Sequence, residues 1–177
     1  AINSFGCNLW ETSFDPLPKG MYYLKLFKKI KQRNLLLACR FECWSIPTKK
    51  FVDLFKETFN SDGSEIVISP ETGSNFIRKK NKGFYYSNTQ LIEILDYIIF
   101  EKKIFVDLFF TVGLPYENEE HIKETIDLIV NIKKRYQRIR INCEPIAMEP
   151  AAPWAKNKDE YGIFTKNLLF KDFYTAH

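Results

Sequence analysis

The chain alternates short apolar runs with amphipathic helical segments, and this alternation restricts its possible folds more than any other feature of the sequence. Successive apolar runs lie about 30 to 40 residues apart, which is the spacing of βα units. Because parallel neighbouring strands need right-handed crossovers, we expect a curling sheet with its helices outside. The order therefore predicts an α/β protein, a partial (βα) barrel of the TIM type with five parallel strands and outer helices.

Five apolar runs are the candidate strands. They are INSFGCNLW (2–10), NLLLACRFECW (34–44), EIVIS (65–69), IFVDLFFTV (104–112) and IRINCEPIAM (139–148). The fourth run is almost continuously apolar, which predicts a strand covered on both faces. A doubly wound open sheet is the competing fold. We favour the barrel because no strand leads into a glycine-rich dinucleotide-binding turn.

Helices are predicted over residues 20–33 and 48–59. Two further helices are predicted to begin at capping residues, Ser87 and Asn118. Ser87 and Gln90 have the spacing of a capping box. Asn118 is expected to cap the last clear helix, and apolar residues at helical spacing follow it. The stripe expected to face the sheet is Ile122, Ile126 and Ile129.

The 177 residues are enough for one domain with a sizeable core, so we treat 1–177 as a single domain. No apolar run approaches the roughly 18 residues that a membrane helix needs. Four scattered cysteines without a signal peptide predict reduced thiols and a cytoplasmic location. The chain lacks an initial Met, and we expect it to be part of a longer parent protein.

Basic runs that also contain aromatic residues leave a second class of function open. They are KLFKKIKQR (25–33), IRKKNKGFYY (77–86) and NIKKRYQRIR (131–140). Lysines can neutralise phosphates while aromatic rings stack on bases. Cations at solvated helix faces and helix C-termini explain the same pattern, because they suit the helix dipole. A non-enzymatic nucleic-acid-binding or scaffold domain is therefore the alternative interpretation.

In a βα barrel the chemistry lies at the C-terminal ends of the strands, where the loops converge. Every predicted strand has a carboxylate near this end. These residues are Glu11, Glu42, Glu71, Glu117 and Glu144. Arg40 precedes Glu42 on the second strand. The pattern predicts an acceptor-rich rim suited to amino, hydroxyl or cationic groups, and we expect Glu11, Arg40 and Glu42 on this rim to bind a cofactor.

The segment from Ser69 to Asn75 leaves its strand through Pro and Gly, which places backbone amides and hydroxyls around the Glu71 carboxylate. Such a turn, including Gly73 and Ser74, can bind a ribose or an amino acid moiety. An ordinary Pro-Gly turn is the alternative. His121 and His177 provide neither a zinc site nor a catalytic triad.

Three stretches resemble a known family: SPETGS, FVDLFFTVGLPYENEEHIKETIDLI and INCEPIAMEPAAPW. They are similar to the C-terminal part of the radical S-adenosylmethionine (SAM) enzymes. The likeness is closest to the cobalamin-associated branch, which often reads E-S-G-S on one strand and G-L-P-x-E-T on the next. LWETSFDP resembles the D-D-x-F strand end of that branch. The likeness covers roughly residues 3–164.

The resemblance implies a partial βα barrel of six units. In that family a C-x-x-x-C-x-x-C loop holds a [4Fe-4S] cluster, and SAM binds the remaining iron. Reduction yields a 5′-deoxyadenosyl radical that abstracts a hydrogen from the substrate. The parent protein is thus expected to be an iron–sulfur oxidoreductase-like enzyme using SAM and the cluster. Cobalamin as a further cofactor rests on family likeness alone, and the substrate stays unknown.

The resemblance also implies roles for residues of this chain. Those expected at the ribose and amino acid portions of SAM are Ser69, Glu71 and Ser74. Those expected to pass under the adenine are Gly113, Leu114 and Pro115. Those expected to offer backbone edges to the adenine are Ile146, Ala147 and Met148.

The cluster motif itself is missing from the chain. Cys39 and Cys43 have the first spacing of the motif, but Ile46 stands at the third ligand position. Both cysteines also lie on one face of a predicted strand, so we assign no metal ligand here. We expect this chain to match the family's second to sixth strands, with the cluster ligands in a missing N-terminal portion upstream of Ala1. The isolated chain is then expected to be inactive.

Overall fold

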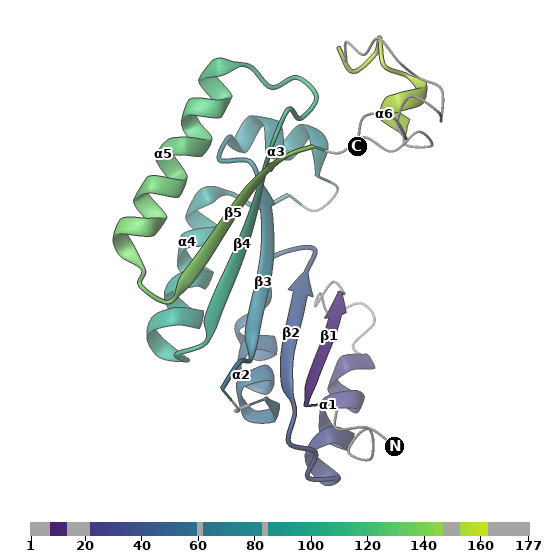
Figure 1. Ribbon diagram of the computed structural model, residues 1–177, viewed down its shortest axis with the longest axis vertical. Helices are drawn as coiled ribbons and strands as arrows, with labels where there is room; N and C mark the ends of the chain where they lie inside the picture. Colours follow the sequence, from purple (N-terminus) through teal and green to yellow (C-terminus); the bar gives the residue numbers. More distant parts are fainter. Residues whose placement is uncertain (1–7, 14–21, 60–61, 83–84, 147–152, 163–177) are drawn as a thin grey trace.

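The structure is a computed structural model, and it describes residues 8–13, 22–59, 62–82, 85–146 and 153–162. Its five strands form one fully parallel sheet in chain order, β1-β2-β3-β4-β5 (Figure 1). The strands are β1 (Leu9–Ser13), β2 (Ala38–Cys43), β3 (Glu65–Glu71), β4 (Phe105–Val112) and β5 (Ile139–Pro145). The predicted partial barrel of five parallel strands with outer helices is confirmed.

The helical elements alternate with the strands. They are α1 (Tyr22–Gln32), α2 (Lys49–Thr58), α3 (Asn75–Asn81), α4 (Asn88–Asp96), the π-helical η2 (Tyr97–Glu101), α5 (Glu119–Arg135) and α6 (Pro153–Lys156). The sequence predicted one helix between β3 and β4, and this was wrong because α3 also lies there. At seven residues, α3 is too short to show an apolar period. None of the described helices is long and apolar enough to cross a membrane.

The hydrophobic core lies between one face of the sheet and helices α1, α2, α4 and α5. Alternate strand residues point into it because successive side chains of a strand project to opposite faces. Many of its members are aromatic, and the ring centroids of Phe41 and Phe51 lie 4.8 Å apart. The fully buried rings are Phe27, Phe41, Phe51, Phe55, Phe59 and Phe110.

The prediction that β4 is covered on both faces is confirmed only in part: helices cover one face, and on the other Asp107 is buried while Phe105 and Phe109 are half-buried. Val106, Leu108 and Phe110 face the helices. Phe105, Asp107 and Phe109 alternate with them and lie on the opposite, inner face of the sheet. Two phenylalanines on that face lie beneath cations: the Arg40 guanidinium is 5.8 Å from the ring centroid of Phe109, and Phe105 lies similarly below another arginine. Because these two residues are phenylalanines, the sequence of β4 is almost continuously apolar although its inner face contacts charged groups.

The buried stripe of α5 also differs from the prediction. Ile129 of the predicted stripe packs against the core, but Ile126 is 54% exposed, and the buried residues are Thr125, Leu128 and Ile132. The predicted Asn118 cap is confirmed, since its side chain accepts a hydrogen bond from the His121 amide. The helix is turned so that Thr125 contacts the loop after β3, and this contact cannot be read from the periodicity of α5 alone.

Candidate functional site

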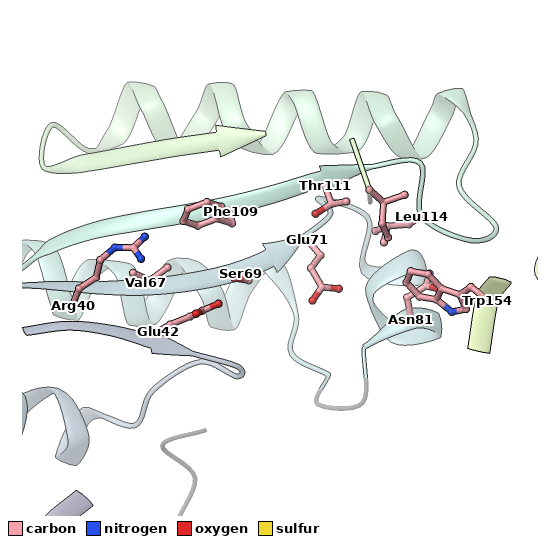
Figure 2. Close-up of a pocket in the computed structure, with 11 residues that line it drawn as sticks. Arg40, Glu42, Val67, Ser69, Glu71, Asn81, Phe109, Thr111, Leu114 and Trp154 are labelled. Carbon is pink, nitrogen blue, oxygen red and sulfur yellow. The ribbon is translucent and has the colours of Figure 1, made fainter. Parts of the chain in front are cut away.

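A pocket of about 570 Å³ opens where the C-terminal ends of β2, β3 and β4 meet (Figure 2). This volume lies within the roughly 300–1,000 Å³ that is usual for small-molecule sites. The lining residues are Arg40, Glu42, Val67, Ser69, Glu71, Asn81, Phe109, Thr111, Leu114, Ile146 and Trp154. The predicted corners after β3, β4 and β5 thus share one hollow, through Glu71, Leu114 and Ile146.

Glu71 has an unusual backbone for a residue with a side chain. Its φ is +66°, and the β3–β4 register shifts between Ile68 and Glu71. A left-handed non-glycine residue costs about 1–2 kcal/mol, so its surroundings must hold it. The Nζ of Lys82 lies 2.7 Å from Oε1 of Glu71 and donates to the Ser69 carbonyl at 2.9 Å. The carboxylate is therefore fixed at the pocket wall.

A fully buried arginine holds the loop that carries Glu71. Nε of Arg78 donates to the Pro70 carbonyl at 3.1 Å, and Nη2 donates to the Thr72 carbonyl. These carbonyls flank Glu71 on both sides. Nη1 donates to the Tyr86 carbonyl at 3.0 Å. Burial lowers the pKa of Arg78, as expected for a cation whose hydrogen-bond acceptors are neutral oxygens. Arg78 therefore stabilises the left-handed turn.

Gly73 and Ser74 lie away from this pocket, beside α5, where they line a separate hollow. The Gly73 amide donates to Oγ1 of Thr125 at 2.8 Å, and the Thr72 and Thr125 hydroxyls lie 3.1 Å apart. A Cβ on Gly73 would come within 2.4 Å of the Thr125 Cα. Ser74 is buried as the N-cap residue of α3. The geometry gives Gly73 a packing role, and its contact with a cofactor stays a prediction.

The loop after β4 depends on its own glutamate. Gly113 has φ +89°, a left-handed conformation that favours glycine. The amides of Gly113 and Leu114 donate to Oε2 of Glu117 at 2.7 and 3.3 Å. Glu117 therefore folds back onto its loop. The Pro115 carbonyl accepts a hydrogen bond from the side chain of Asn81 at 3.0 Å. Of the three predicted loop residues, Gly113, Leu114 and Pro115, only Leu114 lines the pocket.

A charge network crosses the inner face below the pocket. Arg40 contacts carboxylates from three strands: Glu11 at 2.5 Å, Glu65 at 2.7 Å and Asp107 at 3.1 Å. Arg140 also contacts Asp107, at 2.6 Å. Burial lowers the pKa of Arg40, but its carboxylate hydrogen bonds outweigh this effect and raise the pKa above its ordinary value. Three of the Arg40 nitrogens are therefore already engaged by the chain.

Sequence reasoning found some of these residues and missed others. The missed residues are Glu65, Val67, Arg78, Asn81, Lys82, Asp107, Phe109, Thr111, Arg140 and Trp154. Arg78 and Lys82 lie in a basic run that was interpreted as a solvated face, and no local signal marks them as buried. Ala147 and Met148, both predicted at the adenine, lie outside the described residues.

The described cysteines do not fit an iron–sulfur cluster. Cys39 and Cys43 are fully buried in the core on the helix side of β2. Burial raises the pKa of Cys39 to about 12, so its thiol keeps its proton, whereas a cluster needs thiolates. Among the described residues, no group of three or more His, Cys, Asp or Glu side chains is arranged to hold a metal ion.

Comparison with known proteins adds a likeness of sequence and a likeness of fold. No family model matches the chain. Uncharacterized protein MJ0966 of Methanocaldococcus jannaschii is 31% identical over 122 residues, which are 64% of this chain and 26% of that protein. The chain therefore spans about a quarter of the length of this relative.

Two solved structures of TsrM from Kitasatospora setae, a radical SAM methyltransferase, share the fold. The one with cobalamin and a [4Fe-4S] cluster matches 86% of this chain and 30% of its own, with a TM-score of 0.68 and 15% identity. The one with tryptophan substrate and the SAM analogue aza-SAM matches 75% and 26%, with a TM-score of 0.60 and 16% identity. The described sheet and helices thus share the fold of one part of TsrM, which makes up less than one third of that protein.

Proposed function

We propose that this chain forms the SAM-binding part of the catalytic partial barrel of a radical SAM enzyme. The observation that carries the proposal is the single pocket shared by the exits of β3, β4 and β5. The fold likeness to TsrM supports it independently of those residues. Binding sites in barrels of this kind lie at this end of the strands.

The residues present fit the polar and apolar parts of SAM. Glu71 and Ser69 offer oxygen acceptors for ribose hydroxyls or an amino group, and Lys82 keeps Glu71 in place. Leu114 and Ile146 offer apolar surface for the adenine. Bound next to a reduced cluster, SAM supplies a radical that abstracts hydrogen. We propose that the cluster ligands, and cobalamin if the parent protein uses it, belong to parts of the parent outside this chain.

The nucleic-acid alternative loses support from the positions of the basic side chains. Arg78 is buried, Lys82 pairs with Glu71, and Arg140 pairs with Asp107. These cations belong to the basic runs that the nucleic-acid interpretation uses to neutralise phosphates. Buried or paired, they are not free to do so. We therefore keep one proposed function.

Isothermal titration with S-adenosylhomocysteine tests the proposal, because this ligand needs no cluster for binding. The wild-type chain is expected to bind it. Glu71→Gln should weaken binding about tenfold or more, since a hydrogen bond to a charged group contributes about 1.5–3 kcal/mol. Glu93→Gln, which removes a charge from an exposed position of α4, is the matched control. A wild-type chain that does not bind, or a Glu71→Gln variant that binds equally well, would refute the proposal.

A further inference from the structure

Glu42 is a carboxylate in the pocket whose charge the described residues do not compensate. It lies on the inner face of β2 and lines the pocket between Arg40 and Glu71 (Figure 2). The side chain is half-buried, and it has no hydrogen bond or ion pair with any other residue that the structure describes. A partly desolvated carboxylate without a cation favours a positively charged neighbour.

Among the described residues, Arg40 lines this pocket and Lys82 contacts Glu71 at its wall, and both cations are already engaged. Arg40 is bound to three other carboxylates, as described above. The Nζ of Lys82, with a side chain only 9% exposed, contacts Glu71 and the carbonyl of Ser69. Neither can turn to Glu42 without leaving another carboxylate unpaired, which costs free energy. The matching cation is therefore expected from a ligand.

An exposed aromatic side chain contacts the strand residue that pairs with Glu42. Ser13 of β1 pairs in register with Glu42, so the two side chains project to the same face. The Nε1–H of Trp44 donates to Oγ of Ser13 at 2.6 Å, so the edge of the indole contacts the β1 residue that pairs with Glu42. Trp44 is 52% exposed. Its only polar atom is satisfied, so an aromatic face is available to a cation.

We propose that Glu42, with Trp44 at the rim, forms a subsite for the ammonium group of the substrate. We assign this subsite to the substrate, and the part of the same pocket lined by Glu71, Leu114 and Ile146 to the cofactor. Val67, which pairs in register with Glu42, and Phe109 also line the pocket, so the substrate class is a primary amine on an apolar or aromatic group. Its assignment to the substrate rests on the proposed function, whereas the preference for a cation rests on Glu42 and its neighbours.

Two probes of matched shape and opposite charge test the subsite. Phenethylammonium and 3-phenylpropionate are titrated into the wild-type chain, and binding is followed by ligand-observed NMR. The cation should bind saturably and the anion should not. Glu42→Gln should weaken the cation about tenfold, the loss typical of one hydrogen bond to a charged group. Glu93→Gln should leave it unchanged. Equal binding of both probes, or a cation affinity unaffected by Glu42→Gln, overturns the proposal.

A parallel titration with S-adenosylhomocysteine separates the subsite from the proposed function. Glu42→Gln should bind this ligand as the wild type does, and loss of binding would move Glu42 into the cofactor part and overturn the proposal. If the wild type fails to bind S-adenosylhomocysteine yet binds the cation through Glu42, the proposed function fails and the amine subsite stands. If Glu42→Gln does not fold, Glu42→Asp, with its shortened reach, should weaken the cation severalfold, and an unchanged affinity would overturn the proposal.

Discussion

Gly73→Ala tests how the loop that carries Glu71 is held against α5. The added Cβ would lie 2.4 Å from the Thr125 Cα, 2.6 Å from the Glu124 carbonyl oxygen and 2.8 Å from the Thr125 amide nitrogen. All three are backbone atoms, so no change of side-chain rotamer relieves the overlap. Since ordinary contacts begin at 3.4 Å, the loop and α5 must separate by about 1 Å.

This separation disrupts two buried hydrogen bonds, from the Gly73 amide to Thr125 and between the Thr72 and Thr125 hydroxyls. Each contributes about 1 kcal/mol. Overpacking strain adds about 1–3 kcal/mol. The free energy of unfolding should therefore fall by about 3–5 kcal/mol, a large part of the roughly 5–15 kcal/mol typical of a domain.

Urea unfolding measures this loss. With a slope of about 2 kcal/mol per molar, the midpoint should drop by about 2 M. Gly162→Ala is the control, because its Cβ meets nothing within 4 Å and only its φ of +64° is unfavourable. That control should cost only about 1–2 kcal/mol. Thr125→Ala combined with Gly73→Ala should not restore stability, because the clash is with the backbone. A Gly73→Ala variant with the wild-type midpoint would refute this account of the contact.

Two further predictions concern buried charges and thiols. Asp107→Asn should lower the free energy of unfolding by about 3–5 kcal/mol, because the 1% exposed carboxylate pairs with Arg40 and Arg140. Asp127→Asn, at an exposed position of α5, is the control. Equal urea midpoints for the two variants would contradict this reasoning. The pKa of Cys39 is raised by burial from 9.0 to about 12, so the folded state keeps a proton that the unfolded state loses above pH 9. The free energy of unfolding should therefore fall between pH 9 and 12 by up to about 1.4 kcal/mol per pH unit. Cys39→Ala should make this fall less steep, as measured by urea midpoints at pH 8, 10 and 11. An equally steep fall in the variant would count against the buried thiol.

Features that depend on neighbours along the chain were readable in advance. The spacing of apolar runs predicted five parallel strands, and the capping box of Ser87 with Gln90 is present as expected. The Asn118 cap was found for the same reason. Such signals survive folding because a cap or a strand period involves residues only a few positions apart. The corners at Glu71 and Leu114 could be located because parallel strands end at one edge of the sheet.

Contacts between distant segments could be decided only by the tertiary structure. Asp107 contacts Arg40 across 67 positions, and Thr125 contacts Gly73 across 52. Nothing near Arg78 in the sequence distinguishes it from the solvated cations beside it, yet it is buried under the turn that carries Glu71. A charged or small side chain takes its role from the group packed against it, and the partner is set by how the sheet curls and how each helix is turned upon it.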